Sequence, residues 1–174
     1  METYLRPGLE LREASEADKA DRRVYAMLQL LGAMENGFGN AAYGIAWEDY
    51  PAFIDTLIRQ RDAPDLAGGF VPQASLWLFD GDEAIGYAKL RYYLNDRLRE
   101  RGGHIGYGIR SDRRGQGYAS AMLALCLRRA EALGIGEALI TCDEANIASR
   151  RVIEKNGGRL ISLPGEHCRY LVLT

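Results

Sequence analysis

The stretch RGQGYA at residues 114–119 decides the fold, because it lies where a strand pattern gives way to a helix pattern. The strand candidate HIGYGI precedes it at residues 104–109, and an apolar stripe at three- and four-residue steps follows it as far as Leu133. The first N–H groups of a helix lack intrahelical partners, and the peptide dipoles add partial positive charge there. Glycines let such a backbone approach an anion closely, so the segment indicates a phosphate or pyrophosphate site.

Other interpretations of this glycine-rich turn are open. Such turns also join strands to helices without any ligand. A P-loop would continue with Gly-Lys-Ser or Gly-Lys-Thr, but Tyr118, Ala119 and Ser120 follow Gly117 here. A dinucleotide-binding turn would place its third small position at Ser120, and the turn lies late in the chain. Both nucleotide motifs therefore fit less well than a third interpretation.

That interpretation comes from a second segment, NIASRRVIEKNG at residues 146–157. One helix candidate and one strand candidate separate it from the glycine turn. Together the two segments resemble the signature of the GNAT acetyltransferase superfamily, in which R/Q-x-x-G-x-G/A precedes a later N-x-x-A/S helix. The resemblance covers the chain from about residue 104 onward, and the order of the earlier elements is compatible with it.

The resemblance implies a mixed α/β fold of the GNAT type. We expect a central, mostly antiparallel, twisted sheet of about six to seven strands flanked by about four helices. A single domain would span residues 1–174. The resemblance also implies acetyl-CoA as the cosubstrate.

In such a fold the backbone of the strand before the turn pairs with the pantetheine arm, the turn holds the pyrophosphate, and the later helix approaches the thiol. Each assignment has a structural alternative: Asn146 suits a helix N-cap, Ser149 could face solvent, and Tyr107 and Ile109 could be ordinary core residues. The residues expected to bind acetyl-CoA are Tyr107, Ile109, Arg114, Gly115, Gln116, Gly117, Tyr118, Ala119, Ser120, Asn146 and Ser149.

The transfer of an acetyl group to an amine needs a base, because only the neutral amine attacks the thioester. His104 stands at the start of the strand candidate before the turn, and an imidazole titrates in the range that suits this task. We therefore expect His104 to be the base. Glu100 and Asp143 are the carboxylate alternatives.

The expected acid departs from the pattern of the superfamily. Many members carry a tyrosine seven residues after the asparagine of the second segment, but Ile153 stands there and cannot donate a proton. Tyr170 or Tyr107 would then protonate the leaving thiolate, unless the thiolate leaves unaided. Cys142 ends the strand before Asn146, and we rank a covalent intermediate on it below direct transfer.

The rest of the chain follows simple periodic patterns. Ser15 and Asp18 form a weak capping box that starts a helix, and Gly37 is its expected stop. Pro51 suits the first turn of a second helix, and the Pro- and Gly-rich residues 63–72 indicate a loop. The expected strands are 9–12, 75–79, 84–88, 104–109, 138–142, 159–163 and 169–173.

Composition excludes several classes of protein. The 174 residues carry a formal net charge of −2, which offers no support for a nucleic-acid partner, and no apolar stretch is long enough to span a membrane. The three cysteines are widely spaced, so they suggest neither a disulfide framework nor a metal site. We expect a cytoplasmic protein without a metal, and a homodimer is possible.

The resemblance implies an enzyme that moves an acetyl group directly from acetyl-CoA to a primary amine of a small molecule or peptide. Because Ile153 replaces the usual tyrosine, one alternative stays open. In that alternative the chain holds CoA as a sensor or structural module without turnover.

Overall fold

The computed structural model describes residues 7–35, 37–163, 165 and 167–174 and has a mixed α/β fold. A four-stranded antiparallel sheet has the order β1-β4-β5-β6, and a three-stranded antiparallel sheet has the order β7-β9-β8. Strands β2 and β3 form a separate ribbon. The strands are β1 (Leu9–Glu13), β2 (Met34–Glu35), β3 (Phe38–Gly39), β4 (Gln73–Asp80), β5 (Glu83–Arg91), β6 (Ile105–Ile109), β7 (Glu137–Asp143), β8 (Arg159–Ser162) and β9 (His167–Leu173).

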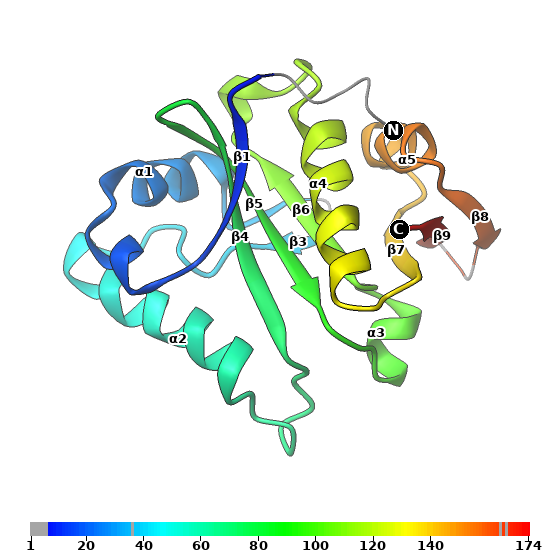
Figure 1. Cartoon of the computed structure of the whole chain (residues 1–174), viewed down its shortest axis with the longest axis horizontal. Helices are drawn as coiled ribbons and strands as arrows, with labels where there is room; N and C mark the ends of the chain where they lie inside the picture. Colours follow the sequence, from blue (N-terminus) through cyan, green and yellow to red (C-terminus); the bar gives the residue numbers. More distant parts are fainter. Residues whose placement is uncertain (1–6, 36, 164, 166) are drawn as a thin grey trace.

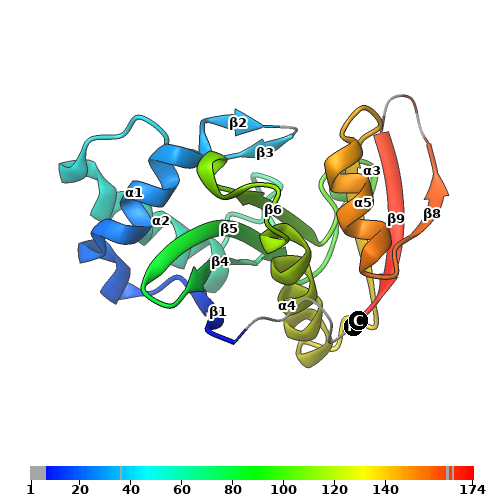
Figure 2. The same ribbon diagram turned by 90° about the horizontal axis from the view of Figure 1, so that it is seen from above.

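Helices cover both faces of the four-stranded sheet. Helices α1 and α2 lie on one face and α4 lies on the other, while α5 lies beside the three-stranded sheet (Figures 1 and 2). None of the helices among the described residues has the length and apolar character needed to cross a membrane. The helices are η2 (Glu16–Ala20), α1 (Arg22–Leu31), η3 (Trp47–Asp49), α2 (Tyr50–Asp62), α3 (Asp96–Glu100), η4 (Ser111–Arg113), α4 (Tyr118–Ala132) and α5 (Ile147–Lys155).

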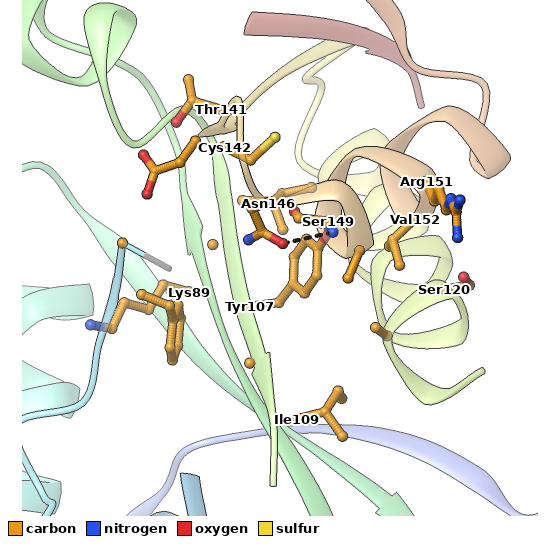
Figure 3. Close-up of a pocket in the computed structure, with 18 of the residues that line it drawn as sticks. Lys89, Tyr107, Ile109, Ser120, Thr141, Cys142, Asn146, Ser149, Arg151 and Val152 are labelled. Carbon is orange, nitrogen blue, oxygen red and sulfur yellow. Dashed lines mark hydrogen bonds between the residues drawn. The ribbon is translucent and has the colours of Figure 1, made fainter. Parts of the chain in front are cut away.

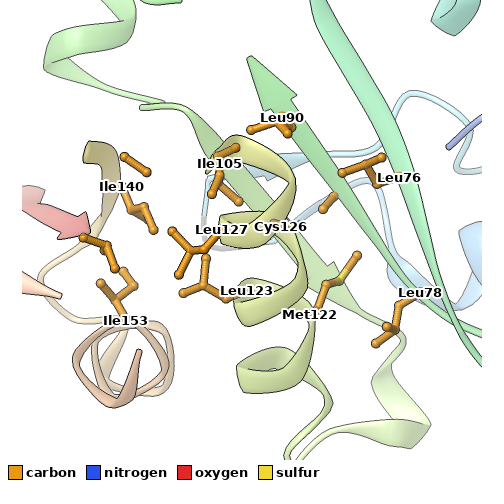
Figure 4. Packing of buried hydrophobic residues seen from close by; sticks show 14 of the residues in the cluster. Leu76, Leu78, Leu90, Ile105, Met122, Leu123, Cys126, Leu127, Ile140 and Ile153 are labelled. Atoms are coloured by element: carbon orange, nitrogen blue, oxygen red, sulfur yellow. The ribbon is translucent and has the colours of Figure 1, made fainter. Parts of the chain in front are cut away.

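Strand β4 shows why the sequence is apolar at consecutive positions there. Successive side chains of a strand point to opposite faces. Leu76 and Leu78 belong to the core under α4, whereas Trp77 and Phe79 belong to the core under α1 and α2. Figure 4 shows the first of these cores, in which residues of α4 pack between the two sheets. The expected fold class is confirmed.

The first helix differs from its prediction. The capping box is present, since the Ser15 N–H donates to Asp18 Oδ2 at 2.7 Å, but it starts only a short 3₁₀ turn. Asp21 then has an extended backbone that separates this turn from α1, and its side chain caps α1. The expected stop at Gly37 is wrong, because α1 ends at Gly32 and the residues after it pair as the β2-β3 ribbon.

The central sheet also differs in detail. In the described residues the two larger sheets together hold seven strands, in line with the prediction, and the β2-β3 ribbon was not predicted. These seven strands divide into two sheets between β6 and β7 instead of forming one. The residues between β5 and β6 contain α3, whose first turn Asn95 caps through an Oδ1 that accepts the Leu98 N–H at 3.0 Å. The division between β6 and β7 is the feature that creates the site.

Candidate functional site

Strands β6 and β7 meet at one end and separate toward the other. At the meeting point the His104 N–H donates to the Leu139 carbonyl at 2.7 Å, and the Leu139 N–H donates to His104 Nδ1 at 2.9 Å. Beyond this pair, the described residues of β6 and β7 form no ladder. The space between the strands belongs to a cleft of about 600 Å³ that Tyr107, Ile109 and Cys142 help to line.

The meeting point, which we call the apex (Gly102, Gly103, His104 and Leu139), depends on a glycine. Gly103 has φ +60°, and a Cβ built on it would lie 2.3 Å from the Leu139 carbonyl oxygen. Arg91 Nη1 donates to the Gly102 and Gly103 carbonyls at 3.1 and 2.9 Å. The apex is therefore a close approach of two backbones that only glycine permits.

The glycine turn forms one wall of the cleft. Gly117 is the N-cap of α4 and has φ +87°, a conformation that suits glycine. Arg114 Nε donates to the Ile109 carbonyl at 3.0 Å, and the Tyr118 hydroxyl donates to Asp80 Oδ2 at 2.7 Å, so the turn is tied to β6 and to the β4-β5 hairpin. Because these residues line the cleft, the positive end of the α4 dipole lies at its wall, where it favours an anion.

The start of α5 forms the opposite wall. Asn146 Oδ1 accepts the Ser149 N–H at 3.0 Å, so Asn146 caps the helix, and it also lines the cleft (Figure 3). The Ser149 hydroxyl lies 3.0 Å from the Tyr107 hydroxyl on β6. Burial raises the pKa of Tyr107, so its phenol keeps its proton. Two hydroxyl groups therefore meet where β6 faces α5.

Cys142 lies next to this hydroxyl pair. Burial raises its pKa to about 12, so the thiol is protonated near neutral pH and is a weak nucleophile. Its pairing partner on the neighbouring strand β9 is Cys168, and both thiols are free. This environment does not support a covalent step on Cys142.

An imidazole and a carboxylate that line the cleft form a close pair. His167 Nδ1 lies 2.8 Å from Asp143 Oδ1, and both residues line the cleft. Arg101 Nη2 lies 3.5 Å from the same carboxylate oxygen. A carboxylate that holds one ring nitrogen of a histidine leaves the other nitrogen available to accept a proton.

Cations line the two walls near the glycine turn. Arg113 is paired with Glu83, but Arg151 and Lys155 on α5 meet no carboxylate within ion-pair distance in the described part of the chain. Their i, i+4 spacing places both side chains on one face of α5. The sequence reasoning missed this pair, although the spacing within the second segment could have revealed it.

Most of the predicted binding residues come together. Every residue expected to bind acetyl-CoA lines the cleft except Gln116. His104 and Tyr170, the expected base and acid, do not line it. His104 Nδ1 accepts a hydrogen bond at the apex, and the buried Tyr170 hydroxyl donates to Glu154 Oε1 at 2.9 Å and accepts from Arg150 Nε at 3.1 Å.

Ile153 lies in the hydrophobic core rather than in the cleft. Its side chain is fully buried beside Ile140 and Leu123 (Figure 4). The sequence reasoning also missed Lys89, Arg91 and His167. The alternation of Tyr87, Lys89 and Arg91 along an otherwise apolar strand was a signal, whereas His167 gave none because its partner Asp143 is distant in sequence.

Comparisons with known proteins agree with this geometry. No curated protein sequence matches the chain. Among solved structures it is similar to RimL, a ribosomal L7/L12 alpha-N-protein acetyltransferase in complex with coenzyme A through a disulfide to a cysteine. The TM-score is 0.65 with 18% identity over 97% of this chain and 95% of that chain.

Two further structures share the fold. The ribosomal-protein-S5-alanine acetyltransferase from Vibrio fischeri has a TM-score of 0.65 with 13% identity over 97% of this chain and 94% of that chain. The putative acetyltransferase yncA from Salmonella typhimurium, solved with acetyl-CoA, has a TM-score of 0.57 with 16% identity over 95% of this chain and 94% of that chain. A family model described as acetyltransferase (GNAT) domain matches residues 9–159, so the chain belongs to the GNAT acetyltransferase family.

Proposed function

We propose that this protein is an N-acetyltransferase that moves an acetyl group directly from acetyl-CoA to a primary amine of a small molecule or peptide. One observation carries the proposal: the two sequence segments that resemble the family signature lie on opposite walls of one cleft, between strands that separate. The free thiols of all three cysteines support a reducing, cytoplasmic setting.

The residues of the cleft fit acetyl-CoA. The start of α4 offers N–H groups to a pyrophosphate, and Arg151 and Lys155 are cations without a carboxylate partner in the described part of the chain. The facing edges of β6 and β7 leave backbone groups available to an extended arm. When bound, acetyl-CoA would supply the acetyl group as a thioester.

We assign the base to the pair of His167 and Asp143. Asp143 Oδ1 accepts the Nδ1 proton of His167, which leaves Nε2 to take a proton from the acceptor ammonium. The neutral amine then attacks the thioester carbon, a C–N bond forms, and the C–S bond breaks. The nitrogen loses a further proton as it becomes the amide, which balances the proton that the leaving thiolate takes up. His104 does not fit this role because its Nδ1 is used at the apex.

We assign the stabilisation of the leaving thiolate to Ser149 and Tyr107. Their hydroxyl groups lie 3.0 Å apart, so a proton that one of them donates to the sulfur can be replaced from the other. Because the raised pKa of Tyr107 keeps the phenol protonated, the pair retains a donor near neutral pH.

The proposal is tested by calorimetric titration with acetyl-CoA and by measuring CoA release with a panel of primary amines. We expect binding and amine-dependent release, and we expect His167→Gln to lower kcat at least tenfold while it leaves the Kd for acetyl-CoA unchanged. Absence of acetyl-CoA binding would overturn the whole proposal.

One further function deserves the same experiment. Ile153 stands where many members of the superfamily carry a tyrosine acid, and it lies in the core, so this position supplies no proton donor. Its absence favours a module that binds CoA without turnover. Tight binding without CoA release from any amine would support that module, whereas release above the rate without protein would eliminate it.

A further inference from the structure

A second cavity of about 450 Å³ lies on the face of the four-stranded sheet that α2 covers. Part of its wall is apolar, from Phe53, Phe70 and Val71, and part is polar, from Gln60 and Gln73. Its volume falls in the range of sites for small organic ligands. No step of the proposed reaction uses this cavity.

Two cations lie where this cavity meets the cleft. Lys89 and Arg91 line both spaces, and since they are two residues apart on β5 their side chains leave the same face of the sheet. Figure 3 shows Lys89 on the side of the cleft opposite α5. A molecule that spans the two spaces must pass these two side chains.

Lys89 is largely buried and has no acidic partner. Its Nζ donates to the Gly39 carbonyl at 2.7 Å and lies 5.1 Å from the centre of the Phe38 ring and 5.4 Å from that of Tyr87. In the described part of the chain no carboxylate comes within ion-pair distance of it. Burial, together with a smaller effect of the charge of Arg91, lowers the pKa of Lys89 to about 8.

Arg91 is in a similar position. Its Nη1 makes the two hydrogen bonds at the apex, but within the described residues no hydrogen bond uses Nε or Nη2 and no carboxylate pairs with it. Burial is also the main cause that lowers the pKa of Arg91. One edge of its guanidinium group is therefore left for a ligand.

Two other partly buried arginines, Arg61 and Arg110, are paired with carboxylates. Arg61 meets Glu13 and Asp62, and Arg110 meets Glu83 and Asp112. Two like charges that are removed from water without a counterion oppose folding. An anion placed between Lys89 and Arg91 would remove this cost, so the junction is built to receive one.

We propose that the acceptor is a free α-amino acid, whose carboxylate binds Lys89 and Arg91. This inference rests on the proposed function, because it names the acceptor class of that reaction. The unused edge of Arg91 matches the two oxygens of a carboxylate. An α-amino group lies one carbon away from that carboxylate, so it reaches the cleft while the side chain occupies the second cavity.

The test compares amino acids with their carboxamides, using CoA release by the full chain. The amide keeps the amine and side chain but loses the negative charge. We expect kcat/KM to be at least tenfold higher for the acid, and we expect Lys89→Met to raise KM for the acid about tenfold and to leave the amide unaffected. Arg128→Gln removes an exposed cation of α4 and serves as the control.

The possible results separate the two proposals. Equal turnover of acids and amides, or better turnover of peptides, would overturn the amino-acid assignment and leave the acetyltransferase intact. If Lys89→Met lowered kcat for acids and amides alike and moved the pH profile, Lys89 would be a base and the assignment would also fall.

Binding gives a readout that does not need turnover. In the presence of CoA, amino acids should raise the melting temperature of the natural chain more than their amides do, and this difference should vanish in Lys89→Met. A preserved difference in the variant would contradict the inference. If CoA release failed with every amine while this difference held, the proposed enzyme would fall and the binding site would stand.

Discussion

The two sides of the four-stranded sheet differ in how their sites are built. The cleft to which we assign acetyl-CoA comes mostly from one continuous part of the chain, residues 105–155. The second cavity combines side chains of four separate segments, represented by Ala41, Phe53, Phe70 and Lys89. A ligand shared by a family leaves a local pattern in the sequence, whereas an acceptor is recognised by contacts that exist only after folding.

The largest effect is expected from a substitution at the apex, where the two sheets meet. We expect Gly103→Ala to lower the free energy of unfolding by about 3 kcal/mol, because the Cβ would overlap the Leu139 carbonyl and the positive φ disfavours alanine. Denaturant unfolding measures this change, and the affinity for acetyl-CoA should fall with it.

Gly136→Ala is the matched control for the apex. A Cβ on Gly136 would meet no atom within 4 Å, and its φ is not positive. We expect a change of less than about 0.5 kcal/mol in the free energy of unfolding. An effect of Gly103→Ala no larger than that of the control would show that the two strands do not need this close approach.

On the acceptor side, Asn40 holds the segment after α1. Its buried amide donates to the Leu28 and Gly32 carbonyls at 2.7 and 3.0 Å and accepts the Ala42 N–H at 3.1 Å. We expect Asn40→Ala to cost about 2 kcal/mol, since it leaves buried backbone groups without partners. Hydrogen exchange should show faster opening around α1, with little change in the affinity for acetyl-CoA. A large loss of that affinity would show that the two sides of the sheet do not act independently.

On the cofactor side, Asn146→Ala should have a smaller and more local effect. The loss of the cap on α5 is expected to cost about 1 kcal/mol in the free energy of unfolding. If the helix start also positions the cofactor, calorimetry should show about a fivefold weaker Kd for acetyl-CoA. Asn146→Ser is the control, because serine also caps helices; an equal loss in both variants would point to a direct contact of the amide.

The smallest expected effect concerns pH. Burial and the charges of Arg99 and Arg91 lower the pKa of His104, so the unfolded chain binds a proton at a pH where the folded chain resists it. The stability that neutral His104 contributes is therefore present above its ordinary pKa near 6.5 and is lost as pH falls below it. We expect His104→Gln, which keeps an acceptor for the Leu139 N–H, to flatten the stability curve below about pH 6.5.

The same pH series with His167→Gln gives the comparison. His167 lies at the open end of the cleft, beside Asp143 rather than at the apex. If both variants shifted the curve in the same way, the assignment of the pH response to the apex would be wrong.

The sequence predicted the fold class, the positions of most strands along the chain and many of the residues that line the cleft, because these depend on periodicity and on local turn chemistry. It did not predict that α1 ends at Gly32, since Gly32 and Gly37 are equivalent as local stop signals and the β2-β3 ribbon decides between them. It also expected a base at His104. That residue stands at the right place along the strand, but its ring nitrogen is used by Leu139, 35 positions further along the chain.

The pairs that were missed share one cause. Asp143 and His167 meet because β7 and β9 are antiparallel neighbours, and Lys89 and Arg91 border two cavities because both cavities lie against β5. The first pair depends on strand register, and the setting of the second depends on how distant segments pack around β5. Local patterns carry no information about them.

The separation of β6 and β7 also bears on the tendency of the protein to associate with itself. Unpaired sheet edges are templates on which other chains can add strands, and natural proteins usually protect them. If acetyl-CoA lies along these edges as an additional strand, the cosubstrate also shields the protein from self-association. The supply of CoA would then set not only how fast the enzyme turns over but also how long it stays in solution.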